Sequence, residues 1–240
     1  MTARLLLEYD GAGFSGWARQ PGLRTVQGVV EDAIATVRGE PVTLTVAGRT
    51  DAGVHALGQV ASHPGEPVPA GALNRLLPGD VRVLESVRAP DGFDARRDAI
   101  ARRYRYRVHT RPVPSVFERG RALHWKHPID RAALDACAAA VVGTHDFTAF
   151  TPTQTTHVRF ERDVFLSEWR DAGPDLLEYH IEADTFMRHM VRILVGTMLG
   201  VAAGRRSVAD FERLLEGRPR TEAGDTAPAC GLYLEAVRYP

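Results

Sequence analysis

The chain has 240 residues, of which 44% are hydrophobic and 25% are charged, values that are ordinary for a soluble globular protein. Its 30 basic and 30 acidic residues give a formal net charge of zero, so the basic excess typical of nucleic-acid binders is missing. The 2 cysteines fit a reducing compartment and exclude both a disulfide framework and a cysteine metal site. The most apolar segment, 186–203, carries two arginines and a histidine, which excludes an ordinary membrane span. We therefore expect a soluble, cytoplasmic protein.

The first hundred residues alternate between strand and helix patterns. Thr25 is a typical helix N-cap, apolar residues then recur at helical spacing, and Gly39 is a typical helix end. In chain order the patterns predict a strand at 3–9, a helix at 26–37, strands at 42–46 and 56–62, a helix at 70–77 and a strand at 81–87. Trp17, in the loop after the first strand, is interpreted as a core aromatic.

The run AGRTDAGVHALGQV at 47–60 holds one acid, Asp51, among small and flexible residues. Arg49 lies two residues before the acid, and the preceding strand delivers the carboxylate onto a glycine-rich turn. A carboxylate on such a turn, with a guanidinium nearby, is a plausible catalytic layout. The alternative is a tight turn in which Asp51 only hydrogen-bonds its own backbone.

Arginines are concentrated between residues 96 and 111, where seven of them accompany a single acid, Asp98. Within this stretch the run RYRYRV at 103–108 alternates with period two, which on a strand separates the tyrosines from the arginines. Aromatic rings that stack on bases, next to arginines that bind phosphate, are what an extruded or single-stranded base needs. A strand with its tyrosines in the core and its arginines in water explains the pattern equally well.

The second half repeats the alternation of helices and strands. Patterns and caps predict a helix that Asp130 caps and Gly143 ends, a polar loop at 144–156, a hairpin of strands at 158–169 and 176–183, a helix at 186–199 capped by Asp184 or Thr185, a helix at 208–216 and a strand at 230–237. The predicted class is α+β, with two similar α/β halves at 1–100 and 101–240. Their largely antiparallel sheets are expected to join into one continuous sheet with helices packed on one side.

The helix predicted at 186–199 carries Arg188 and Arg192 near one another, and no acid occurs from residue 185 to residue 209. Burying an unpaired charge is costly, so these arginines must reach solvent, an anionic ligand or an acid elsewhere in the chain. Asp51 is a candidate for that acid.

Three runs, AGRTDAGVHALGQV at 47–60, FDARRDAIARRYRY at 93–106 and FMRHMVRILVG at 186–196, resemble the tRNA pseudouridine synthase A (TruA) family. The opening EYDGAGFSGW, TVQG at 25–28, HDFTAF at 145–150 and the ending GLYLEAVRYP agree in the same order, so the resemblance covers essentially the whole chain. Two places depart from the family pattern: Leu57 is bulkier than expected, and the loop at 151–161 matches poorly.

The resemblance implies that the chain converts uridines at positions 38, 39 and 40 of the tRNA anticodon stem-loop to pseudouridine. It also implies a homodimer that uses no cofactor and no metal, with its active site in a cleft between the halves. The family nucleophile falls on Asp51, the active-site tyrosine on Tyr104, and the arginine that pairs with the aspartate on Arg192. Residues expected to contact the RNA or its base are Arg49, Arg96, Tyr104 and Leu232.

Two chemical roles for Asp51 stay open at this point. A carboxylate can attack the sugar carbon or remove a ribose proton, and both start detachment of the base. Because the target base lies in a stem-loop, it has to be extruded first. His55 and His189 are interpreted as structural or RNA-contacting residues. The alternatives to this enzyme are an RNA-binding module without chemistry and a nucleoside glycosidase, which would need a second positioned acid.

Overall fold

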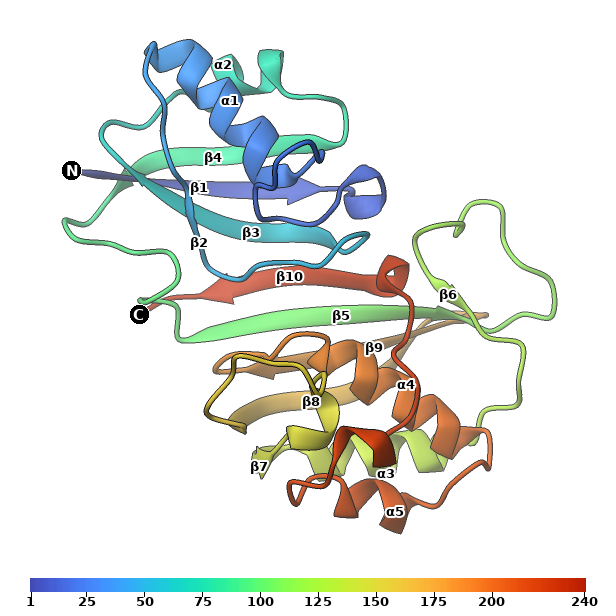
Figure 1. Cartoon of the computed structure of the whole chain (residues 1–240). Helices are drawn as coiled ribbons and strands as arrows, with labels where there is room; N and C mark the ends of the chain where they lie inside the picture. Colours follow the sequence, from blue (N-terminus) through green and yellow to red (C-terminus); the bar gives the residue numbers. More distant parts are fainter. The chain divides into compact units, whose positions relative to one another are not determined.

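The computed structural model describes residues 1–240, and the chain divides into two compact units (Figure 1). Unit 1 consists of residues 1–102 together with 233–240, and unit 2 consists of residues 103–232. Each unit combines a largely antiparallel set of strands with helices, so the predicted α+β class is confirmed.

The strands of unit 1 are arranged around the first strand of the chain. In order across the sheet they are β4 (Val81–Ala89), β1 (Thr2–Tyr9), β3 (His55–Pro64) and β10 (Leu232–Arg238), with the short β2 (Thr45–Val46) beside β3. β1 is antiparallel to both β3 and β4, whereas β10 runs parallel to β3 through Tyr233 and Leu234. The alternation predicted for the first strand is present, because every second residue from Ala3 to Tyr9 is buried.

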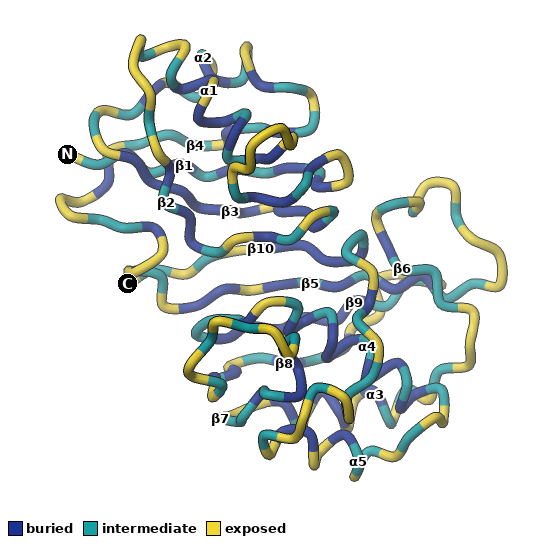
Figure 2. Tube along the Cα trace, in the orientation of Figure 1, coloured by how far each residue is buried: buried dark blue, intermediate teal, exposed yellow.

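The helices of unit 1 are α1 (Val26–Arg38) and α2 (Ala70–Leu76), which pack beside each other, with α2 also packed on β4 (Figure 1). α1 begins and ends where the sequence predicts. The Thr25 hydroxyl accepts a hydrogen bond from the amide of Gly28, and Gly39 ends the helix at a φ of 76°. Figure 2 shows β3 as largely buried, whereas β1 alternates between intermediate and buried residues.

The strands of unit 2 follow the order β5 (Ala101–His109), β9 (Leu176–Ala183), β8 (Glu161–Gly173) and β7 (Gly143–Asp146), with β6 (Leu123–His124) beside β5. The predicted hairpin is confirmed, since β8 and β9 are antiparallel and Trp169 pairs with Tyr179 across it. The helices are α3 (Arg131–Val141), α4 (Met190–Ala202) and α5 (Val208–Arg213), and α3 contacts α4, α5 and β8. Single turns of 3₁₀ helix lie at Gly11–Gly13, Thr148–Phe150, Arg220–Glu222 and Ala229–Gly231.

Two predictions in unit 2 are wrong. Helix α4 begins at Met190, and its N-cap is His189, whose left-handed φ of 63° ends the irregular segment that precedes the helix. The polar stretch after Gly143 is not simply a loop. It forms strand β7 at the edge of β8 and then a 3₁₀ turn that buries Phe150. The sequence of β7 carries no apolar alternation, because its four residues are exposed or half-buried, so no strand pattern can be read from it.

Two glycines of helix α4 test how the helix packs against the segment around Asp225. A Cβ on Gly196 would lie 2.0 Å from the carbonyl oxygen of Asp225, whereas Gly200 has nothing within 4 Å. We expect Gly196→Ala to lower the free energy of unfolding by roughly 1–3 kcal/mol, because the segment around Asp225 must move. Gly200→Ala should raise it by about 0.5–1 kcal/mol through helix propensity. Urea unfolding followed by circular dichroism measures both. Equal effects of the two substitutions would contradict this packing.

Candidate active site

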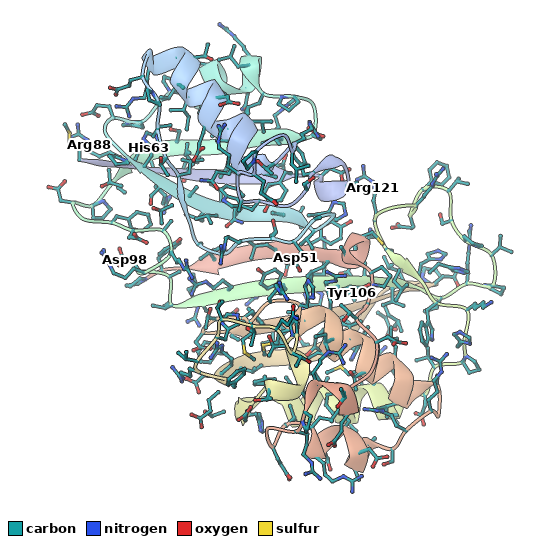
Figure 3. All side chains as sticks on the ribbon, in the orientation of Figure 1. Asp51, His63, Arg88, Asp98, Tyr106 and Arg121 are labelled. Carbon is teal, nitrogen blue, oxygen red and sulfur yellow. The ribbon has the colours of Figure 1, made fainter.

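Asp51 begins a tight turn between β2 and β3 of unit 1 (Figure 3). The amide of Val54 donates to the carbonyl of Asp51 at 3.1 Å, and Gly53, the third residue of the turn, has a φ of 78°. That positive φ is why the turn needs glycine there. The Asp51 residue is half-buried at the start of the turn.

The opening segment of the chain packs against this turn. The amide of Trp17 donates to the carbonyl of Thr50 at 3.0 Å, and a Cβ on Gly11 would lie 1.9 Å from the carbonyl oxygen of Val54. Only glycine allows so close an approach of two backbones. Trp17 is 1% exposed, which confirms its interpretation as a core aromatic.

A buried hydrogen-bond network holds the loop on both sides of Arg49. The hydroxyls of Tyr9 and Thr50 are 2.8 Å apart. The amide group of Gln59 donates to the Tyr9 hydroxyl at 3.2 Å and to the carbonyl of Gly48 at 2.7 Å. Because the three side chains are buried, each unmade bond would cost free energy, and the loop is therefore held in one conformation.

The two arginines expected to contact RNA in unit 1 are both exposed. Arg49 follows the first residues of the loop, and Arg96 lies in the turn between β4 and β5. Neither guanidinium forms a hydrogen bond or an ion pair within the chain, whereas neighbouring Arg97 binds Asp98 at 2.8 Å. Arg49 and Arg96 therefore present charge that the protein itself does not neutralise.

His55, four residues after Asp51, has a structural environment. It is 3% exposed, and its ring stacks on Tyr233 with 4.6 Å between centroids. Its Nδ1 lies 3.1 Å from the amide of Gly11 and 3.0 Å from a carboxylate oxygen of Asp10. These contacts connect the loop of Asp51 to the opening segment, as a structural role requires.

Within unit 2, Tyr104 lies on β5, 8% exposed, with its ring edge-to-face against Phe186 at 5.1 Å between centroids. The arginines that alternate with the tyrosines bind acids of the same unit. Arg103 binds Glu182 at 2.7 Å, and Arg107 binds Glu118 at 2.7 Å. These two arginines are therefore partly neutralised by the protein. The core-and-surface interpretation places the arginines in water, whereas the Arg107 side chain is only 17% exposed.

Arg192 lies in the first turn of α4, where its Nε donates to the carbonyl of Ala227 at 2.8 Å and its own carbonyl accepts from the Ala227 amide at 3.0 Å. The helix face that the sequence marks as cationic thus packs along the segment 225–231. Arg188 precedes the helix and donates to the carbonyl of Gln154 at 3.1 Å, so it does not share that helical face.

The segment 225–231 leads to Leu232, which is 6% exposed. The hydroxyl of Tyr106, on β5 (Figure 3), donates to the carbonyl of Pro228 at 2.8 Å. A Cβ on Gly231 would lie 2.7 Å from the Tyr106 ring, so glycine is needed for this approach. Burial raises the pKa of Tyr106 well above its usual range, which keeps its hydroxyl a donor.

The structure thus places the predicted residues in two groups. Asp51, Arg49 and Arg96 belong to unit 1, and a second group, Tyr104, Arg192 and Leu232, belongs to unit 2. An ion pair of Asp51 with Arg192 stays a prediction. Sequence reasoning assigned no supporting role to Tyr9, Gln59, Arg102 or Tyr106. All four lie within the quoted runs, but their hydrogen-bond partners are set by the fold.

No group of three or more His, Cys, Asp or Glu side chains is arranged to hold a metal ion. None of the helices combines the length and the apolar character needed to cross a membrane.

Comparison with known proteins shows the family to which the chain belongs. The family described as "tRNA pseudouridine synthase" matches residues 6–82 and 137–240. A tRNA pseudouridine synthase A of Acetivibrio thermocellus is 40% identical to the chain and covers 99% of both sequences. The protein of the same name from Frankia casuarinae is 46% identical over 99% of this chain and 89% of its own length. One from Bacillus pumilus is 39% identical over 100% and 99%.

These matches define an enzyme of the isomerase class. The chain belongs to the tRNA pseudouridine synthase family, and the resemblance seen in its motifs is confirmed at this level.

Tyr9 makes the buried network sensitive to alkaline pH. Burial raises the pKa of Tyr9 to about 12, from 10.0 in an exposed tyrosine. Between these values the unfolded chain loses the proton first, so stability falls as pH rises from 10 towards 12. The loss from Tyr9 alone should be about 1.4 kcal/mol by pH 11.

Urea unfolding at pH 9, 10 and 11, for wild type and Tyr9→Phe, measures this effect. The variant should start less stable at pH 9 by about 1 kcal/mol, because Thr50 and Gln59 lose a partner. Its stability should then fall less steeply than that of the wild type. Parallel curves for the two proteins would show that Tyr9 does not contribute in this way.

Proposed function

We propose that this protein isomerises uridine to pseudouridine in the anticodon stem-loop of tRNA, and that Asp51 starts the reaction. The observation that carries the proposal is the rigid presentation of one carboxylate. Asp51 is the only acid between Glu40 and Glu66, and its turn is hydrogen-bonded to the opening segment and to the buried Tyr9 network. A catalytic group must be held within a fraction of an ångström of the reacting atom, and these contacts supply such a constraint.

The reaction exchanges one bond to the ribose for another. The bond from uracil N1 to C1′ breaks, the uracil turns, and its C5 bonds to C1′. C5 then loses its proton, while N1 ends with one. The Asp51 carboxylate would either attack C1′ and later leave it, or remove a ribose proton as the uracil leaves and return that proton to the ribose when C5 bonds to C1′. Both routes need an ionised carboxylate and a site closed to water, because the detached base must not escape.

We assign Tyr104, Arg192 and Leu232 to the same uridine. Tyr104 would pack on the uracil or guide removal of the C5 proton, and Leu232 would supply an apolar contact to the base. Arg192 would pair with Asp51 and favour its charged form. The bond from the Arg192 Nε to Ala227 supports its role, because it restrains the guanidinium, and the close packing of Gly231 on Tyr106 fixes the backbone next to Leu232.

Arg49 and Arg96 would bind phosphates of the tRNA, since both are exposed and unpaired within the chain. We further propose targets at positions 38, 39 and 40 of the tRNA, a homodimer, and action in the cytoplasm, where tRNA is the substrate. These follow from the family resemblance of the motifs rather than from the contacts within the chain.

Asp51→Asn should abolish pseudouridine formation while tRNA affinity changes less than about threefold, because the amide keeps the shape of the side chain but is not a nucleophile or base. Chemical labelling of pseudouridine and filter binding measure the two properties. Asp91→Asn, which alters an exposed acid of the same unit, is the control and should stay fully active. Turnover by Asp51→Asn at the wild-type rate would reject the assignment.

Affinity for tRNA should weaken with salt, since bound phosphates release counterions. Arg96→Gln should lower the magnitude of the slope of log Kd against log salt by about one unit. Arg97→Gln is the matched control. Its guanidinium already pairs with Asp98, so its loss should change the slope by much less. If the two variants behave alike, Arg96 does not bind a phosphate.

A further inference from the structure

Arg102 is a buried arginine that joins two loops of unit 1. It is 7% exposed, although arginine is rarely buried. Its Nε and one terminal nitrogen both donate to the carbonyl of Ala47, at 3.2 Å and 2.9 Å. The same terminal nitrogen donates to the carbonyl of Arg96 at 2.8 Å, and the other donates to the carbonyl of Ala99 at 2.9 Å.

These carbonyls belong to the two segments that carry the exposed arginines. Ala47 is the residue at which the loop of Asp51 begins, two residues before Arg49, and Ala99 closes the turn that contains Arg96. The planar fork of one guanidinium therefore spans both segments. A lysine ammonium carries its three donors on one nitrogen and cannot reproduce four bonds in this fixed planar arrangement.

The turn that contains Arg96 is also held by hydrogen bonds within the turn and by bonds to Tyr239 and to β3. Asp94 accepts hydrogen bonds from the amides of Arg96 and Arg97, each at 2.8 Å. The hydroxyl of Tyr239 donates to the carbonyl of Ala95 at 2.7 Å, and the amide of Ala95 donates to Ser62 on β3 at 3.1 Å.

Apolar packing completes this arrangement. Ala47, Val60 and Ala95 form one buried cluster, against which Phe93 and Tyr239 pack. The start of the loop of Asp51 and the turn of Arg96 thus share one small core within unit 1.

From these contacts we infer that Arg102 is a positioning residue for the isomerisation. It holds the loop of Asp51 at a fixed position relative to the phosphate-binding turn of Arg96. The inference rests on the proposed function. A tRNA held through Arg49 and Arg96 is placed relative to Asp51 only if the two segments keep a fixed separation. Arg102 and, through Ala95, Tyr239 maintain that separation. Neither side chain touches the uridine in this role.

The test compares Arg102→Lys with Arg88→Lys, which changes an exposed arginine of the same unit that pairs with Glu66. Three properties are measured: the thermal unfolding midpoint, the Kd for unmodified tRNA, and the single-turnover rate of pseudouridine formation at saturating tRNA. All assays are run at least 15 °C below the midpoint of each protein, so that the protein is folded.

For Arg102→Lys we expect a rate about 10–100-fold below wild type, because small misplacements of a reacting group cost this much. The Kd should change less than about threefold, because Arg49 and Arg96 are still present. A residue that only stabilises the fold would lower the midpoint and leave the rate of the folded protein unchanged. Arg88→Lys should match wild type in rate and Kd.

Tyr239→Phe covers the case in which Arg102→Lys does not fold, since it removes only the bond to Ala95. Its rate should fall about threefold to tenfold with Kd unchanged, from a smaller misplacement. The inference about Arg102 is overturned by one combination of results. In it, Asp51→Asn is inactive, while Arg102→Lys and Tyr239→Phe, or whichever of the two folds, turn over at the wild-type rate. If Asp51→Asn is itself active, the proposed function fails instead.

Discussion

The hydrogen bonds that enclose the loop of Asp51 are the constraint on which unit 1 depends. Buried polar groups supply them from several directions: Tyr9 and Gln59 from the sheet, the opening segment through Trp17, and Arg102 at the start of the loop. Because each group is desolvated, loss of one bond leaves a partner unsatisfied. The loop is thereby limited to one conformation, and a half-buried carboxylate is presented by backbone that cannot easily relax.

In unit 2 the segment 225–231 is also held in place, by close backbone packing and by side-chain bonds to its carbonyls. Close backbone approaches at Gly196 and Gly231 seat the segment 225–231 against α4 and β5, and Arg192 and Tyr106 fix it through two of its carbonyls. Arginines on the opposite side of β5 are paired with acids of the same unit. A chain with zero net charge thus separates its arginines into those the protein neutralises and exposed ones, such as Arg49 and Arg96, that it does not.

Sequence patterns predicted most of the elements, because caps and periodicity are local. Thr25 and Gly39 mark α1, and the strand alternation of β1 is read directly from its residues. Longer-range features were missed. The left-handed His189 moves the start of α4 to Met190, and β7 is held by pairing with β8 and by bonds of Asp146 to the segment 215–216. Arg102 reads in sequence as one more arginine of a basic run. Two of its four bonds go to the carbonyl of Ala47, 55 residues away in the chain, which no local pattern encodes.

This chain rearranges a uridine within tRNA, whereas a binding module would only hold the tRNA and a glycosidase would cleave the base from it. The most direct measurement incubates the purified wild-type protein with an unmodified tRNA transcript, then maps pseudouridine by chemical labelling and assays free uracil. We expect labelled pseudouridine in the anticodon stem-loop and no released uracil. Bound tRNA without pseudouridine would identify a binding module, and released uracil would identify a glycosidase. Either result would show that the chain does not isomerise uridine.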